Sequence, residues 1–321
     1  MFIFHQFSMQ FMDLYTKFGN VDEMTQNAAT TLLFVTTSIR MVNFYWNRMR
    51  YVNIINTLHD GLIQMMSSQD EQAKLIIASE MRYMKRLTKA FWICALITGN
   101  LMCFHSAIQS TSFPPVILRS WFPFVDHWKY FWVIYGIQYY IMNIGMLIVP
   151  CWHSFIVSIM IFVIIRLKFL SLELCKMKEN SSGGSFSNIE LVKCVNERQK
   201  IGEFVMEVSS LISPALFLDF IIFSILLCAL LFQATQVDAG VQFAIILFYI
   251  LTMTTILWMY YNHANEITFH SDQLSLSAYK CSWYDYSLNF NKQLLLFIAS
   301  SKPIKIASYS YFTLLTQLVS K

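Results

Sequence analysis

The side chains best suited to chemistry in this sequence are a few ionisable residues set among long apolar stretches. His263, Glu266 and His270 have a helical spacing that places them on one face of a helix, so a metal site is one interpretation. The other is a polar helix end that emerges into the cytoplasm. Because no further strong ligand can be identified, we expect neither a bound metal nor a cofactor.

Asp219 is the only charged residue between Val208 and Val237. An acid inside a membrane span is by default a functional candidate that faces a cavity or a partner. The alternatives are a solvated position near a helix end and a polar contact between helices, and the sequence does not decide among them. His105 and His153 lie in or near apolar stretches, where we expect packed or interface histidines rather than ligands.

Enzyme signatures are absent from the sequence. The seven cysteines form no C-x-x-C pair, which argues against zinc and redox motifs. There is no Walker loop, no G-x-S-x-G, no H-E-x-x-H and no pair of intramembrane aspartates. We therefore do not expect an enzyme.

The stretch from Trp132 to Met146 mixes apolar bulk with Tyr, Gln and Asn side chains. Such a mixture suits a small-molecule pocket, where a few hydrogen-bonding groups orient an apolar ligand. Composition alone favours the simpler explanation, which is helix packing with an aromatic belt at the membrane surface.

The elements that position these residues must be membrane helices. Apolar residues make up 56% of the 321 residues and charged residues 13%, against about 45–50% and about 25% in soluble domains. So little charge cannot cover a soluble surface, and a net charge of +4 spread over an apolar chain does not suit nucleic-acid binding. The composition predicts an all-α, polytopic helical membrane protein.

Uncharged stretches predict the spans, because a helix needs about 20 apolar residues to cross a bilayer. We expect one transmembrane domain over residues 1–321, with helices near 2–18 (partial), 24–47, 88–110, 130–165, 208–234, 240–265, 285–301 and 306–320. The uncharged run from Tyr130 to Ile165 predicts one long, tilted helix with a kink near Pro150.

Basic residues are concentrated in alternate connections. Residues 40–89 contain eight Lys or Arg and residues 166–207 contain seven, whereas residues 119–129 contain two and the connection near 233–240 contains none. By the positive-inside rule the two basic connections are cytoplasmic. The segment after Asn265 is then cytoplasmic too, and the C-terminus is extracellular if the last stretch crosses.

Several stretches, taken in order, resemble the insect odorant receptor family. They are Arg119 to Phe124 with Tyr135 to Tyr139, Cys194 to Phe204, and a C-terminal set of Asn265-Glu266, Ser271, Ala278-Tyr279, Trp283, Leu294 to Phe297, Lys302-Pro303 and Ser308 to Leu315. The resemblance implies a seven-helix subunit of an odorant-gated cation channel. It also implies a tetramer with a common co-receptor, in the plasma membrane of olfactory sensory neuron dendrites.

The resemblance further implies roles for individual residues. A small volatile ligand would bind within the helices, with the candidates Phe34, Ser38, Gly99, Met102, His105, Tyr135, Tyr139, Met142, Met146 and Phe243. By position in the family ending, Leu314 is the pore gate, and Gln317 and Leu318 line the pore beyond it. Tyr279 and Trp283 are the expected packing anchors of the subunit contact.

Alternatives to this interpretation stay open. One is a G-protein-coupled seven-helix chemoreceptor or a carrier, and a related one is a gustatory receptor. Another is a non-functional truncated isoform, because Met1 to Phe18 resembles only half of the family's first helix. Ile306 also runs almost directly into the family ending, so we expect the first and last helices to be shortened.

The charge pattern makes a testable prediction about the loop around Asn180. With Gly183→Cys, a membrane-impermeant thiol reagent should label the chain only after the plasma membrane is permeabilised, because seven basic residues flank this loop. The measurement compares labelling of intact and permeabilised cells, with the unsubstituted chain as background. Labelling of intact cells would overturn the orientation.

Overall fold

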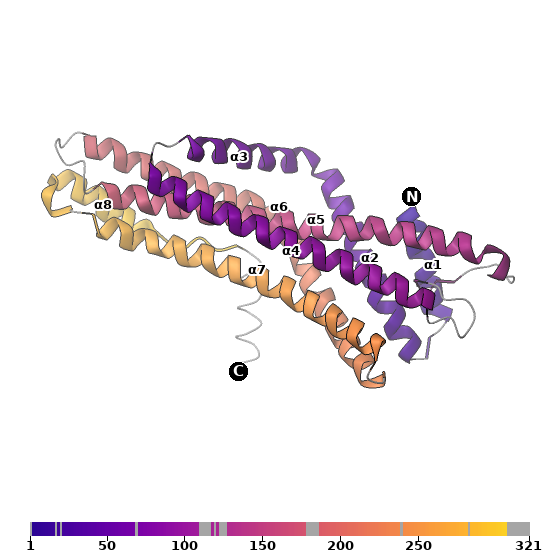
Figure 1. Ribbon diagram of the computed structural model, residues 1–321. Helices are drawn as coiled ribbons and strands as arrows, with labels where there is room; N and C mark the ends of the chain where they lie inside the picture. The colour runs from indigo at the N-terminus through magenta and orange to yellow at the C-terminus, as the bar shows by residue number, and fades with distance from the viewer. Residues whose placement is uncertain are drawn as a thin grey trace. The chain divides into compact units, whose positions relative to one another are not determined.

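The computed structural model describes residues 2–16, 18–19, 21–67, 70–108, 117–118, 120–121, 127–177, 186–237, 240–281 and 283–306. Within these ranges every regular element is a helix, as the composition predicts (Figure 1). The helices are α1 (Phe2–Thr16), α2 (Val21–Trp46), α3 (Arg48–Met66), α4 (Glu71–Ile108), α5 (His127–Lys176), α6 (Phe186–Gln236), α7 (Val241–Tyr279), the short 3-10 helix η1 (Trp283–Asp285) and α8 (Leu288–Ser300).

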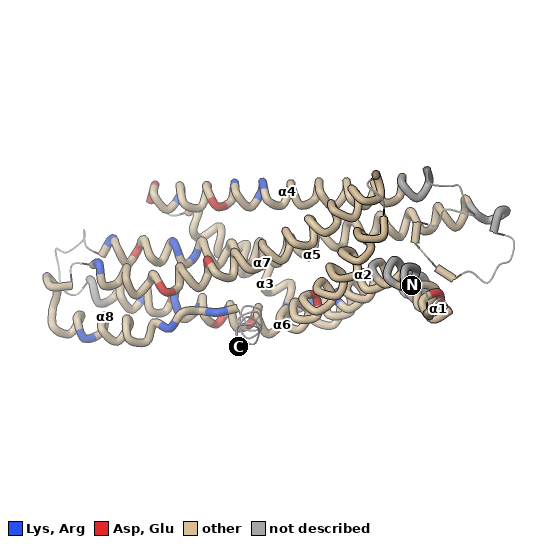
Figure 2. Tube along the Cα trace, turned by 90° about the horizontal axis from the view of Figure 1, so that it is seen from below, with Lys and Arg blue, Asp and Glu red and all other residues tan. Residues whose placement is uncertain are grey.

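The chain forms two compact units, and its long helices contribute to both. Unit 1 comprises residues 1–48, 87–155 and 215–258, and unit 2 comprises residues 49–86, 156–214 and 259–321. Twelve of the 42 Asp, Glu, Lys and Arg residues belong to unit 1, and thirty belong to unit 2. Figure 2 shows these charges gathered along the unit 2 parts of α4, α5 and α6. Unit 1 is therefore the apolar part that suits lipid.

Four helices in the described residues are long and apolar enough to cross a membrane. They lie over 71–104, 132–176, 189–236 and 241–279. The 51 residues of α6 are about 75 Å long at 1.5 Å per residue, more than twice a bilayer core of about 30 Å. Such a helix must project well beyond the lipid, so the basic connection at 166–207 continues largely as helix rather than as loop.

One element was not among the sequence-based spans. α3 lies inside the basic connection 40–89, where no helix was predicted. α2 lies over the predicted span 24–47, and Arg40 and its threonines make it less apolar than α5. The run from Tyr130 to Ile165 does form a single helix, with Pro150 inside it at the expected kink position.

Buried polar side chains tie α1 to α2 in unit 1. Asn27 on α2 donates from Nδ2 to the Gln10 carbonyl (3.2 Å) and to Oδ2 of Asp13 (2.6 Å). Thr31 donates to Oδ1 of Asn27 (2.5 Å). Between the two helices Gly19 has a φ of +108°, a conformation that glycine adopts without steric cost. The turn and the amide of Asn27 together fix how the two helices meet.

Ion pairs between helices hold unit 2. Lys168 on α5 pairs with Glu80 on α4 (2.6 Å). Lys176 pairs with Asp70, the residue before α4, and its hydrogen bond holds the pKa of that carboxyl below the usual range. At the other end of the chain, Tyr286 donates to the Met177 carbonyl. These contacts join α4, the end of α5 and the residue that follows η1.

Candidate functional site

All ten predicted ligand residues belong to unit 1, on α2, α4, α5 and α7. Two of them meet in a buried cluster. Phe34 on α2 packs with Leu118 and Ile141, and Met142 and Ile117 pack against that cluster. Leu118 lies in the connection between α4 and α5 and was not among the predicted residues.

A second pair of predicted residues meets where α4 crosses α5. Gly99 and Met146 are both buried, and a Cβ added to Gly99 would lie 1.8 Å from Sδ of Met146. Only glycine therefore allows this approach. Nearby, the Tyr135 hydroxyl donates to the Cys103 carbonyl (3.1 Å), which joins α5 to α4 a second time.

Ser38 lies one turn beyond Phe34 on the same face of α2. Its hydroxyl is buried and has no hydrogen-bond partner among the described residues. Its neighbours Thr36 and Thr37 instead donate to the Leu33 carbonyl, at 2.9 and 2.8 Å. Ser38 thus keeps a hydroxyl that the helix does not use.

The remaining predicted ligand residues are not part of the Phe34 cluster. Met102 and Phe243 are half-buried, and Tyr139 is exposed. The side chain of His105 lies outside the described part of the chain, as do the predicted pore residues Leu314, Gln317 and Leu318.

Gln138 holds the connection residue Leu118 in place. Its Oε1 accepts from the Leu118 N–H (3.1 Å), and its Nε2 donates to the Leu118 carbonyl (2.9 Å). Both side chains are almost completely buried. The sequence places Gln138 only in a mixed apolar and polar stretch, because its partner lies 20 residues away in a connection.

Asp219 forms a buried ion pair with Arg40. Oδ1 of Asp219 on α6 lies 2.7 Å from Nη2 of Arg40 on α2, and each side chain is 3% exposed. The Arg40 guanidinium also lies 5.8 Å from the ring centre of Trp152 on α5. Asp219 is thus a polar contact between helices, and Arg40, counted above with a cytoplasmic connection, is buried inside unit 1.

His153 is a packed histidine, as expected, and His263 is buried as well. His153 is 1% exposed and lies edge-on to Phe91, with ring centres 5.7 Å apart. His263 in unit 2 is fully buried, with Nδ1 2.7 Å from the Met259 carbonyl oxygen. Within the described chain no three His, Cys, Asp or Glu side chains are grouped so as to hold a metal.

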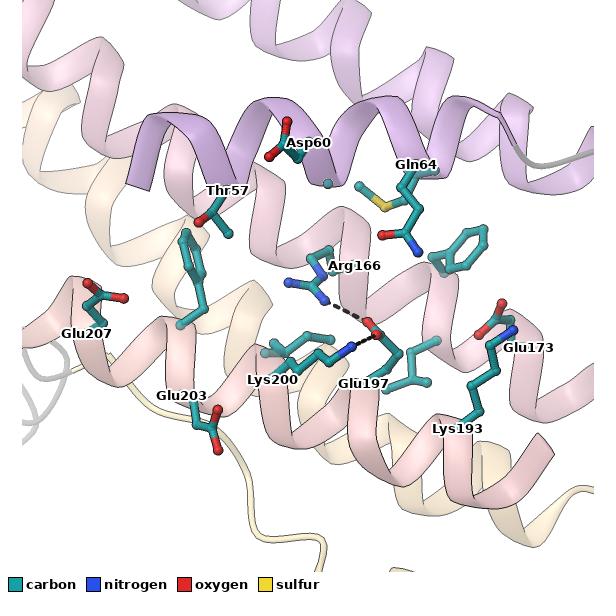
Figure 3. A pocket seen from close by; sticks show the side chains of 16 residues that line it. Thr57, Asp60, Gln64, Arg166, Glu173, Lys193, Glu197, Lys200, Glu203 and Glu207 are labelled. Atoms are coloured by element: carbon teal, nitrogen blue, oxygen red, sulfur yellow. Dashed lines mark hydrogen bonds and ion pairs between the residues drawn. The ribbon is translucent and has the colours of Figure 1, made fainter. Parts of the chain in front are cut away.

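A cavity of about 670 Å³ lies in unit 2, between α3, α5 and α6 (Figure 3). On its wall Glu197 pairs with Arg166 (2.7 Å) and with Lys200 (2.9 Å). Asp60, Glu173 and Glu207 are among its other lining residues, and none of the ten predicted ligand residues lines it. This charged lining does not suit an apolar volatile.

The predicted subunit anchors are exposed at the end of α7. Tyr279 is 61% exposed and Trp283 40%, with ring centres 6.4 Å apart. Tyr284 lies next to Trp283, with ring centres 6.0 Å apart. Their exposure leaves these aromatic faces available for contact.

Comparison with known proteins decides the family. The model of the 7tm odorant receptor family matches residues 20–320. The chain belongs to the insect odorant receptor family. This odorant receptor is 26% identical to Odorant receptor 56a of Drosophila melanogaster, over 94% of this chain and 83% of that one. It is 24% identical to Odorant receptor 10 of Aedes albopictus, over 96% and 88%.

The fold agrees with a solved member of the family. The structure of the olfactory receptor OR5 from Machilis hrabei is similar with a TM-score of 0.84 at 16% identity, over 99% of this chain and 84% of that one. A second structure, OR5 in complex with eugenol, is similar with a TM-score of 0.82. The all-helical odorant receptor architecture predicted from the sequence is thereby confirmed.

The buried ion pair predicts a marked loss of stability when only one partner is removed. Arg40→Met or Asp219→Leu leaves a charge unpaired, which should destabilise the receptor by about 3–5 kcal/mol. The double variant should recover most of the loss. The measurement is the unfolding midpoint of purified receptor in detergent, with Lys74→Met as the control, since Lys74 forms an exposed pair with Glu71. A double variant as unstable as the single ones would contradict the pairing.

Proposed function

We propose that this chain is the ligand-binding subunit of an odorant-gated, non-selective cation channel that acts with the common co-receptor in the plasma membrane of olfactory sensory neurons. The match to the odorant receptor family over residues 20–320 carries the proposal. The same fold occurs in OR5 of Machilis hrabei in complex with eugenol, which supports binding of a small organic ligand.

The ligand site of the proposal lies among the predicted residues of unit 1. The Phe34 and Met142 cluster and the Gly99 and Met146 contact supply apolar surface from α2, α4 and α5. The hydroxyls of Ser38 and Tyr135 add a few polar groups. This is the balance that small-molecule sites use for an apolar ligand.

The pore belongs to the C-terminal stretch in this proposal. Leu314 would form a hydrophobic constriction that closes by excluding water, with Gln317 and Leu318 on the wall beyond it. A ligand that binds unit 1 more tightly in the open channel than in the closed one would shift the equilibrium towards the open channel.

Current measurements test this function directly. Cells that express the chain together with the co-receptor should give an odorant-evoked cation current that persists when G proteins are blocked. Each chain expressed alone is the control. A response abolished by the block would favour a G-protein-coupled receptor, and a response to soluble tastants without co-receptor a gustatory receptor. A surface-expressed chain silent to a broad odorant panel would favour a non-functional isoform.

Assembly with the co-receptor is a separate prediction. Replacing both Tyr279 and Trp283 by Ala should lower co-purification of the two chains at least about tenfold, because exposed aromatic anchors commonly dominate an interface. Trp258→Ala, which removes another exposed aromatic side chain of α7, is the matched control. Unchanged co-purification of the double variant would count against these anchors.

A further inference from the structure

Leu118 is unusual for a residue in a connection between helices. Connection residues normally run over the surface. Leu118 is instead fully buried, in one cluster with Phe34 of α2 and Ile141 of α5. A side chain from the connection is thus packed between two helices, as a core residue would be.

Both backbone polar groups of Leu118 have hydrogen-bond partners. The amide of Gln138 bonds both its N–H and its carbonyl, and the Ser120 hydroxyl donates to the same carbonyl (3.2 Å). An unpaired backbone group in apolar surroundings would destabilise the fold. Gln138 therefore supplies what allows a connection residue to sit in an apolar cluster.

A second contact fixes the same connection on α1. The Trp121 N–H donates to the Met9 carbonyl (3.1 Å). The connection is thus held at Leu118 by α5 and at Trp121 by α1. These two contacts fix the position of Leu118 between α2 and α5.

The surroundings of Leu118 define a ligand class. Phe34, Ile117, Ile141 and Met142 are apolar. One turn beyond Phe34, the Ser38 hydroxyl is buried without a partner in the described chain. Such a site suits a compact apolar molecule with one oxygen that can bond to Ser38.

We propose that Leu118 is a lid that sets the largest ligand the site accepts, and that Gln138 is the positioning residue that holds this lid closed. The inference rests on the proposed function, since it assigns a size limit to the same ligand site. It concerns apolar molecules with one oxygen, and Leu118 limits how long such a molecule can be.

Truncation of the lid tests the size limit. Straight-chain alcohols, acetates and ketones from butyl to decyl are applied to receptors with Leu118→Ala. The preferred chain length should rise by about two or three carbons, because each methylene newly accommodated lowers the half-maximal concentration about fourfold. Leu147→Ala, an exposed leucine of α5, is the matched control and should leave the preferred length unchanged. If the half-maximal concentration changed by the same factor for every chain length, or did not change, the size limit would be overturned.

Removal of the positioning amide tests how the lid is held. Gln138→Met keeps the length of the side chain and deletes both hydrogen bonds to Leu118, together with a longer one to the Ser120 hydroxyl (3.5 Å). The variant should lose discrimination between short and long ligands, and adding Leu118→Ala should change little more, because the two residues act as one unit. Additive effects of the two substitutions would contradict the positioning role.

A labelling experiment measures the accessibility of position 118 without any current recording. Leu118→Cys should react slowly with a membrane-impermeant thiol reagent and at least about tenfold faster when Gln138→Met is also present. The unsubstituted chain supplies the background from the seven native cysteines. If the labelling rate of Leu118→Cys is the same with and without Gln138→Met, the lid proposal is wrong, whatever the currents show. Absence of any odorant current, with labelling that does depend on Gln138, contradicts the proposed function and leaves the closed connection supported.

Discussion

Lipid offers no partner to a buried polar group, and this constraint shapes unit 1. Arg40 is matched by Asp219, and Asn27 is matched by groups on α1 and α2. The backbone of Leu118 is matched by Gln138. Except for the Thr31 bond within α2, each match joins two separate segments, so the same contacts that satisfy polar atoms also decide how the helices meet.

The two units solve the problem of charge differently. Unit 2 carries most of the charged residues and pairs several of them at partly exposed positions, where an ion pair contributes about 0–1 kcal/mol. The Arg40 and Asp219 pair in unit 1 has almost no exposed surface. A buried pair adds little net stability, yet losing one partner is costly because the surviving charge stays buried.

The fold class followed from the sequence because its signal is compositional. Uncharged stretches mark helices irrespective of what the helices touch, and the run from Tyr130 to Ile165 indeed lies in one helix. α3 was missed because its polar and charged residues exclude it from a search for uncharged runs. Arg40 was misassigned for a related reason, since a count of basic residues cannot distinguish a solvated side chain from one paired across a bundle.

The candidate ligand site was less predictable than the fold, because it depends on which residues contact one another. The sequence suggested Phe34, Gly99, Met142 and Met146, and the structure brings them together in two contacts. Leu118 carried no signal, since a leucine in a connection is ordinary until a distant amide is known to hold it. The same holds for Asp219, whose three interpretations could be separated only by finding its partner.

The buried ion pair also bears on how the receptor is made. Asp219 is synthesised about 180 residues after Arg40, a delay of roughly 10–40 s at 5–20 residues per second. Until then α2 carries an unpaired arginine, and a charged side chain within a membrane helix is costly. The nascent chain must therefore tolerate a poorly anchored α2 until α6 emerges, and the arrival of α6 is the step that commits α2 to its place in the membrane.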